Sequence, residues 1–225
     1  MASKVISQQA QAVQEGPATM TTITTTSTGT SPGTATLESG AADPAGGGEA
    51  TPAVNKAGAD APALTGEHAE LLETLARHRF FLRFTTKNLT DEQAAARTTV
   101  SALTLGGLIR HVALTERRWM DFVVRGADAF VNGFSEREAE FSLADGETLA
   151  DALARYEEVA RRTEEIVAGI PDLGTGHPLP EAPWFEPGAS WSARRVLLHL
   201  IAETSQHAGH ADIIRESLDG ARTMG

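Results

Sequence analysis

The sequence SARRVLLHLIAETSQHAGHADIIRESL, residues 192–218, carries the clearest structural signal in the chain. Apolar and small side chains recur in it at three- and four-residue spacing, which is the period of an amphipathic α-helix. These side chains are Leu197, Leu200, Ile201, Thr204, Ala208 and Ala211. Ser192 is an N-cap residue type, and Gly220 is a glycine of the kind that ends helices. The stretch therefore predicts one long helix with a single stripe facing a core.

Three further segments show the same period, at residues 67–87, 104–124 and 148–167. In the first of them His78 shares the spacing of the leucines, and we expect it to be a surface or core residue without a ligand role. Residues 169–190 are dense in Gly and Pro, so they cannot form the interior of a helix. No alternating pattern of convincing length predicts a strand. Four amphipathic helices, with connections long enough for crossovers, predict an all-α fold, specifically a four-helix bundle.

Composition changes sharply near residue 66. The residues before it are rich in Thr, Ser, Gly, Ala and Pro, as in TTITTTSTGTSPGTAT, and none is aromatic. Such a segment cannot bury enough apolar surface to offset the entropy lost on ordering. We expect residues 1–65 to be a disordered, low-complexity tail and residues 66–225 to be the bundle domain. Met20 is an alternative translation start, since the residues before it show no more pattern than those after it.

Charge and cysteine content restrict the function. The formal net charge is −11 at pH 7, which disfavours a nucleic-acid partner. The chain has no cysteine, so any metal must be held by His nitrogens and carboxylate oxygens, which suit zinc, nickel, iron or manganese. No stretch approaches the roughly 18 apolar residues of a membrane span, and no signal peptide is evident. We expect a cytoplasmic protein that does not bind membranes.

One side of the last helix carries His199, Glu203, His207 and His210. Residues four apart on a helix lie above one another, so Glu203 and His207 can reach one ion. The second helix, LGGLIRHVALTERRW at 105–119, places His111 beside its apolar stripe. Antiparallel or crossing packing would bring His111 opposite the other two. Three protein ligands leave a coordination position open, which is the arrangement of catalytic sites.

The residues alone leave a second interpretation open. A single His beside an apolar face is more often a hydrogen-bonded core residue than a metal ligand. A Glu and a His four residues apart are also common on exposed helix faces.

The stretches LGGLIRHVALTERRW and HLIAETSQHAGHADIIRE resemble the DinB/YfiT superfamily, in particular an actinobacterial branch of DinB-like proteins, and the resemblance spans about residues 67–219. It implies a four-helix bundle whose divalent metal is bound by one His of the second helix and two ligands of the last. These correspond here to His111, Glu203 and His207. Many members have His at the Glu203 position, but the related mycothiol-dependent maleylpyruvate isomerases use the Glu-xxx-His pair. His210 stands where many relatives have Gln, so we expect it to support a ligand or to act as an alternate one.

The resemblance further implies a metal-dependent enzyme, a transferase or isomerase that uses a low-molecular-weight thiol such as mycothiol. The Ala-, Gly- and Arg-rich composition fits an actinobacterium-like source of that thiol. Two alternatives are a non-catalytic, stress-related metal-binding bundle and a metal-dependent hydrolase. We expect zinc as the metal, a small-molecule substrate and a homodimer, and the sequence identifies no catalytic residue. Arg118, His177 and Arg215 are weaker candidates for substrate binding, because arginines more often cover a helix surface.

Overall fold

A computed structural model describes Leu64, residues 66–130 and residues 141–223. The described elements are α2 (Glu67–Phe84), α3 (Asp91–Ala95), α4 (Leu105–Arg125), the 3-10 helix η1 (Gly126–Phe130), α5 (Leu149–Ala168), β1 (Gly176–Pro178), β2 (Ser190–Ser192) and α6 (Ala193–Asp219). The predicted all-α fold is confirmed for this part of the chain. The predicted tail, residues 1–65, lies outside the described residues except for Leu64 and stays a prediction.

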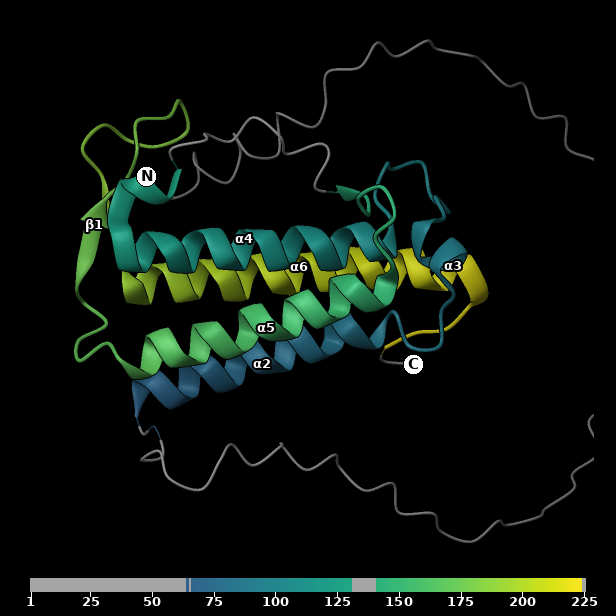
Figure 1. Cartoon of the computed structure of the whole chain (residues 1–225), viewed down its shortest axis with the longest axis horizontal. Coiled ribbons are helices and arrows are strands. Elements are labelled where there is room, and N and C mark those ends of the chain that lie inside the picture. Colours follow the sequence, from purple (N-terminus) through teal and green to yellow (C-terminus); the bar gives the residue numbers. More distant parts are fainter. Residues whose placement is uncertain (1–63, 65, 131–140, 224–225) are drawn as a thin grey trace, which may run out of the picture. The chain divides into compact units, whose positions relative to one another are not determined.

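The four long helices α2, α4, α5 and α6 form a bundle (Figure 1). Helix α6 packs against both α2 and α4, and α5 packs chiefly against α4. Glu67 at the beginning of α2 forms an ion pair with Arg194 at the beginning of α6, so these two helices run parallel. Asp121 and Arg162 form an ion pair between the second halves of α4 and α5, which also run parallel. The connection 126–148 therefore joins opposite ends of the bundle, as the predicted crossovers require.

The pair of α4 and α5 runs antiparallel to the pair of α2 and α6. The strand β1, which precedes α6, contacts η1, which follows α4. The end of α4 and the beginning of α6 therefore lie at the same end of the bundle (Figure 1). Helices α4 and α6 are antiparallel neighbours, and this arrangement positions the candidate site.

Side-chain caps define the beginnings of three long helices. The hydroxyls of Thr104, Thr148 and Ser192 accept hydrogen bonds from backbone N–H groups in the first turns of α4, α5 and α6. Each such cap stabilises a helix by about 1 kcal/mol. Gly220 ends α6 with a φ of 79°, in the left-handed region that glycine adopts without steric penalty. The cap predicted at Ser192 and the stop predicted at Gly220 are confirmed.

Helix α2 ends at Phe84, three residues before the predicted end at Lys87. The hydroxyls of Thr85 and Thr86 donate to the carbonyls of Leu82 and Arg83 at 2.7 and 2.8 Å. Side-chain bonds of this kind offer the backbone an alternative to continuing a helix.

The core stripe of α2 includes the charged residue Arg79. Arg79 is 5% exposed, whereas its neighbour His78 is half-buried. The guanidinium of Arg79 is neutralised inside the bundle by Glu116 of α4, which is fully buried. The sequence analysis did not predict a buried arginine, which is tolerated here because its partner on another helix is buried with it.

The chain segment between α5 and α6 forms a short antiparallel hairpin, in which His177 of β1 pairs with Trp191 of β2. Its strands have three residues each, too few to show an alternating pattern in the sequence. Trp191 stacks on Trp119 of α4, with ring centroids 4.7 Å apart and an interplanar angle of 15°. The hairpin thereby covers the apolar core at this end of the bundle. Within the described ranges, no helix has the length and apolar character needed to cross a membrane.

Candidate metal centre

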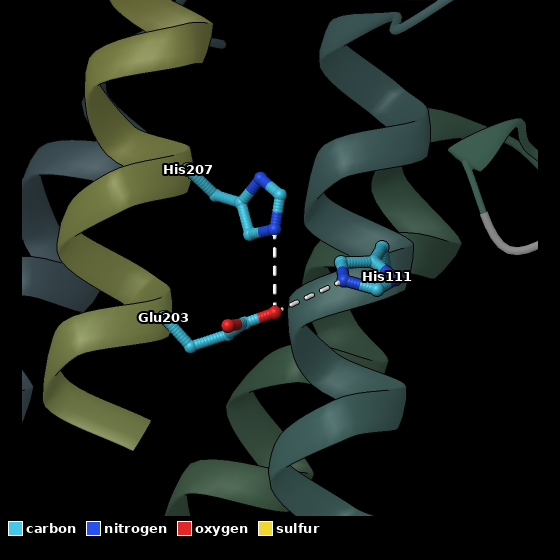
Figure 2. Close-up of side chains that lie close together, drawn as sticks. All are labelled: His111, Glu203 and His207. Atoms are coloured by element: carbon cyan, nitrogen blue, oxygen red, sulfur yellow. Dashed lines mark hydrogen bonds and ion pairs between the residues drawn. The ribbon is translucent and has the colours of Figure 1, made fainter. Parts of the chain in front are cut away.

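Three side chains from two helices converge between α4 and α6. His111 lies in the second turn of α4, while Glu203 and His207 lie one turn apart on α6. Figure 2 shows all three side chains pointing into the space between these helices. The antiparallel packing brings the first half of α4 opposite the middle of α6.

The distances within this cluster suit a shared metal ion. The Nε2 atoms of His111 and His207 lie 3.5 and 3.4 Å from Oε1 of Glu203 (Figure 2). One ligand atom from each of the three residues lies within 4.8 Å of the others. A tetrahedral zinc ion with ligands at about 2.1 Å separates those ligands by about 3.4 Å. Two imidazoles and a carboxylate are also a donor set that zinc and similar ions accept. The residues present therefore fit a divalent metal.

The surroundings favour the metal-binding form of the carboxylate. His111 and His207 are 7% and 8% exposed, and Glu203 is half-buried. Burial by itself would raise the pKa of the Glu203 carboxyl. Hydrogen bonds with His111 and His207 outweigh this effect and hold that pKa well below its ordinary value. Glu203 is thus ionised at neutral pH, as a metal ligand must be.

His210 contacts the cluster from outside it. Its Nδ1 lies 3.4 Å from Nδ1 of His207, the ring nitrogen that faces away from Glu203. Burial lowers the pKa of His210, as does the nearby His207, so the neutral ring is favoured. A neutral His210 can accept a hydrogen bond from Nδ1–H of His207, in the tautomer that would present the Nε2 lone pair to a metal in place of the hydrogen bond to Glu203. This contact supports the first of the two roles expected for His210, support of a ligand.

Two of the predicted substrate-binding residues contact the ends of the bundle. Arg215 donates to the carbonyls of Thr85 and Lys87 at 2.7 and 2.9 Å, and so joins the end of α6 to the end of α2. His177 lies 3.1 Å from the carbonyl of Val123 through its Nε2. The contacts described for these two side chains do not include the three clustered residues.

The third candidate, Arg118, is half-buried two turns after His111 on α4. Its spacing from His111 keeps it on the same side of that helix. A role in substrate binding stays a prediction for Arg118, His177 and Arg215.

The aromatic contacts of two histidines were not predicted. His199, which shares a helix face with Glu203, lies edge-on to Trp119 and Trp191, with ring centroids 5.0 and 5.3 Å away. Phe141 stacks on the ring of His111, with centroids 4.1 Å apart and an interplanar angle of 23°. The sequence did hold a signal for the second contact, because glycines within a helix often mark a close packing approach. Gly106 and Gly107 lie one turn before His111.

Comparison with protein families identifies a match. The sequence model of a family described as MST: Mycothiol-S-transferase matches residues 70–220, which is more than half of the chain. No curated protein matches the chain. The matched range contains all of α4, α5 and α6, and with them the three clustered residues.

Proposed function

The chain belongs to the mycothiol-S-transferase family, and on this premise we propose that it is a divalent-metal-dependent transferase that uses mycothiol as its thiol. The observation that supports metal dependence is the buried cluster of His111, Glu203 and His207, whose ligand atoms lie within 4.8 Å of one another. The family match supports mycothiol as the thiol substrate. The match to a transferase family favours group transfer over isomerisation.

In this proposal His111, Glu203 and His207 hold the ion. A divalent metal bound there would supply a Lewis acid that favours the thiolate form of a thiol, which is the nucleophilic form. The negative charge of Glu203 partly compensates the ion, while the two neutral imidazoles add no charge. His210 orients the ring of His207 by the contact between their Nδ1 atoms. The helix walls around the two histidines restrict access of water.

The chain supplies no sulfur nucleophile of its own, because it contains no cysteine. Transfer of a group onto sulfur therefore needs a thiol co-substrate, and the family supports mycothiol in this role. Zinc is proposed as the metal from the ligand types, with nickel, iron and manganese accepted by the same donors. A homodimer and a cytoplasmic location are part of the same proposal and rest on the sequence analysis.

Elemental analysis of full-length, untagged protein tests the metal. The parent chain is compared with His111→Ala and His207→Ala, and His78→Ala serves as a matched control because His78 is a half-buried histidine on α2. We expect about one equivalent of metal in the parent chain and in the control, and a loss in both other variants. Equal metal content in all four proteins would contradict the assigned ligands.

The thiol is tested separately with the metal-loaded protein. Consumption of an alkylating electrophile is followed with mycothiol, with glutathione and without thiol. We expect acceleration with mycothiol that disappears in His207→Ala. Turnover of the electrophile without any thiol would instead support the hydrolase alternative, and metal binding without turnover would support the non-catalytic bundle.

A further inference from the structure

We propose that Phe141 is a positioning residue for the candidate metal centre, holding the imidazole of His111 in the orientation that directs its Nε2 toward Glu203. This inference rests on the proposed function for its purpose, but not for its geometry. Phe141 lies outside the predicted ligand set, on the segment that leads into α5.

The stacking geometry suits this role. The rings of Phe141 and His111 are 4.1 Å apart at 23°, so Phe141 covers a face of the imidazole. The lone pair of an imidazole nitrogen lies in the plane of the ring. A group stacked on the face therefore fixes the plane without competing for the nitrogen that lies 3.5 Å from Oε1 of Glu203. The Phe141 ring also lies 6.0 Å from that of His207, so it borders both imidazoles.

A glycine in α4 allows the backbone of Phe141 to approach this helix closely. A Cβ atom on Gly107 would lie 1.8 Å from the carbonyl oxygen of Phe141 and 2.8 Å from the backbone N of Ser142. Any other residue would push this backbone away from α4. Glycine within a helix costs about 1 kcal/mol relative to alanine. Gly107 precedes His111 by one turn, so the same face of α4 carries both the contact point for the Phe141 backbone and the histidine that its ring covers.

Polar contacts fix the same segment to α4. The hydroxyl of Thr104 lies 3.4 Å from the carbonyl of Phe141, and Nη1 of Arg110 donates to the carbonyl of Ser142 at 3.2 Å. Arg110 also forms an ion pair with Glu147 at 3.2 Å. These contacts hold the backbone, so the aromatic ring of Phe141 is not required to anchor the segment. A substitution of that ring therefore tests its effect on His111 separately from docking of the segment.

The competing explanation is that Phe141 only fills space beside the core. Phe141→Leu distinguishes the two, because leucine keeps an apolar side chain but removes the stacked ring. Phe141→Tyr restores the ring and is the conservative control. The measurements are the nuclear Overhauser contacts of the His111 ring protons with the side-chain protons of Glu203 and His207 in the metal-free full chain, and the Co²⁺ affinity and visible absorption of the loaded chain. The His111 signals are assigned by their absence in His111→Gln.

The ring current of Phe141 should shift the His111 ring protons upfield in the parent chain and in Phe141→Tyr. In Phe141→Leu this shift is lost together with the ring, so the orientation of His111 is read from the nuclear Overhauser contacts instead. We expect these contacts to Glu203 and His207 to weaken, the Co²⁺ affinity to fall about tenfold, as for other groups that orient ligands, and the cobalt absorption to change. Phe141→Leu with unchanged Overhauser contacts, affinity and cobalt spectrum would overturn the inference. A parent chain that binds no Co²⁺ would contradict the proposed function alone, since the Overhauser contacts are measured without metal and still decide whether Phe141 orients His111.

Gly107→Ala provides a second test from the other side of the contact. The added methyl group should displace the Phe141 backbone and reproduce the loss of the upfield shift of His111. If this variant does not fold, Phe141→Leu carries the test. A folded Gly107→Ala protein with the parent His111 shifts would contradict the role of the close approach.

Discussion

Two buried polar clusters in this bundle each contain a glutamate, yet they are built for different purposes. Glu116 accepts hydrogen bonds from Nε and Nη2 of Arg79 at 3.1 and 2.5 Å, and from the Thr163 hydroxyl at 2.6 Å. Glu203 instead lies 3.4–3.5 Å from two histidine nitrogens. The first carboxylate is neutralised and saturated by donors, whereas the second is surrounded by longer contacts.

The partners determine what each cluster can bind. Arginine has only donors, so the Arg79–Glu116 pair has no lone pair to offer a metal on its cationic side. A neutral imidazole has one lone pair, so His111 and His207 can share an ion with Glu203. A buried carboxylate is therefore structural when its neighbours neutralise its charge, and it is available for function when they do not. The following substitutions test this difference.

The largest effect is expected from Glu116→Ala. It leaves the 5% exposed guanidinium of Arg79 without its buried counter-charge, and breaking such a pair costs about 3–5 kcal/mol of unfolding free energy. Glu164→Ala is the matched control, since Glu164 contacts the same arginine at 3.6 Å with a side chain that is 53% exposed, and a loss below about 1 kcal/mol is expected. Urea unfolding measures both. Equal losses in the two variants would show that the buried Arg79–Glu116 pair contributes no more to stability than an exposed ion pair.

Sequence reasoning reached one cluster and missed the other for a physical reason. Glu203 and His207 are four residues apart, so helical periodicity alone places them together. His111 was expected opposite them from its place beside the apolar stripe of the second helix, and the resemblance to a family supported it. Arg79 and Glu116 are 37 positions apart on different helices, and each is a charged residue that the amphipathic pattern assigns to a solvated face. Only the packing of α2 on the other helices shows that each has a partner.

The fold was predictable to a different degree along the chain. The long helices were predictable because their periodic stripes are long and their ends carry Thr104, Thr148, Ser192 and Gly220. The hairpin was not, because its strands are short and their pairing is tertiary. The Phe141 contact was not predicted either, since it depends on where a connecting segment returns to α4.

Metal addition should show in a single experiment which of the two clusters binds an ion. A ligand that binds only the folded chain raises the unfolding free energy by about 2.7 kcal/mol at 100 times its dissociation constant. We expect zinc to give such an increment to the parent chain and to Glu116→Ala, but not to Glu203→Ala. Urea unfolding with and without zinc, after chelator treatment, measures it. An increment that survives in Glu203→Ala would place the metal elsewhere.

A smaller effect on the metal is expected from His210→Ala. Its loss removes the contact to Nδ1 of His207 but none of the proposed ligands, and such outer contacts typically change metal affinity about 10–100-fold, or 1.4–2.7 kcal/mol. Competition with a chromogenic chelator measures the affinity. Gln206→Ala, an exposed neighbour on α6, is the control and should bind like the parent chain. An affinity loss as large as that of His207→Ala would identify His210 as a ligand instead.

The smallest expected effect is a loss of folding stability at alkaline pH, and it reports on the cluster around Glu116. Burial raises the pKa of Tyr156, and the negative charge of Glu116 raises it further. The folded chain therefore keeps a neutral phenol, and the stability that depends on it is complete below the ordinary tyrosine pKa near 10 and lost as the pH rises above it. At pH 10.5 we expect about 0.8 kcal/mol of this loss in the parent chain and none through this group in Tyr156→Phe. Tyr156 is the single tyrosine, so tyrosinate absorbance is unambiguous, and it should rise only together with the loss of helical circular dichroism. An earlier rise would mean that the interior around Glu116 admits a second negative charge, and the contrast between this saturated cluster and the Glu203 cluster would then disappear.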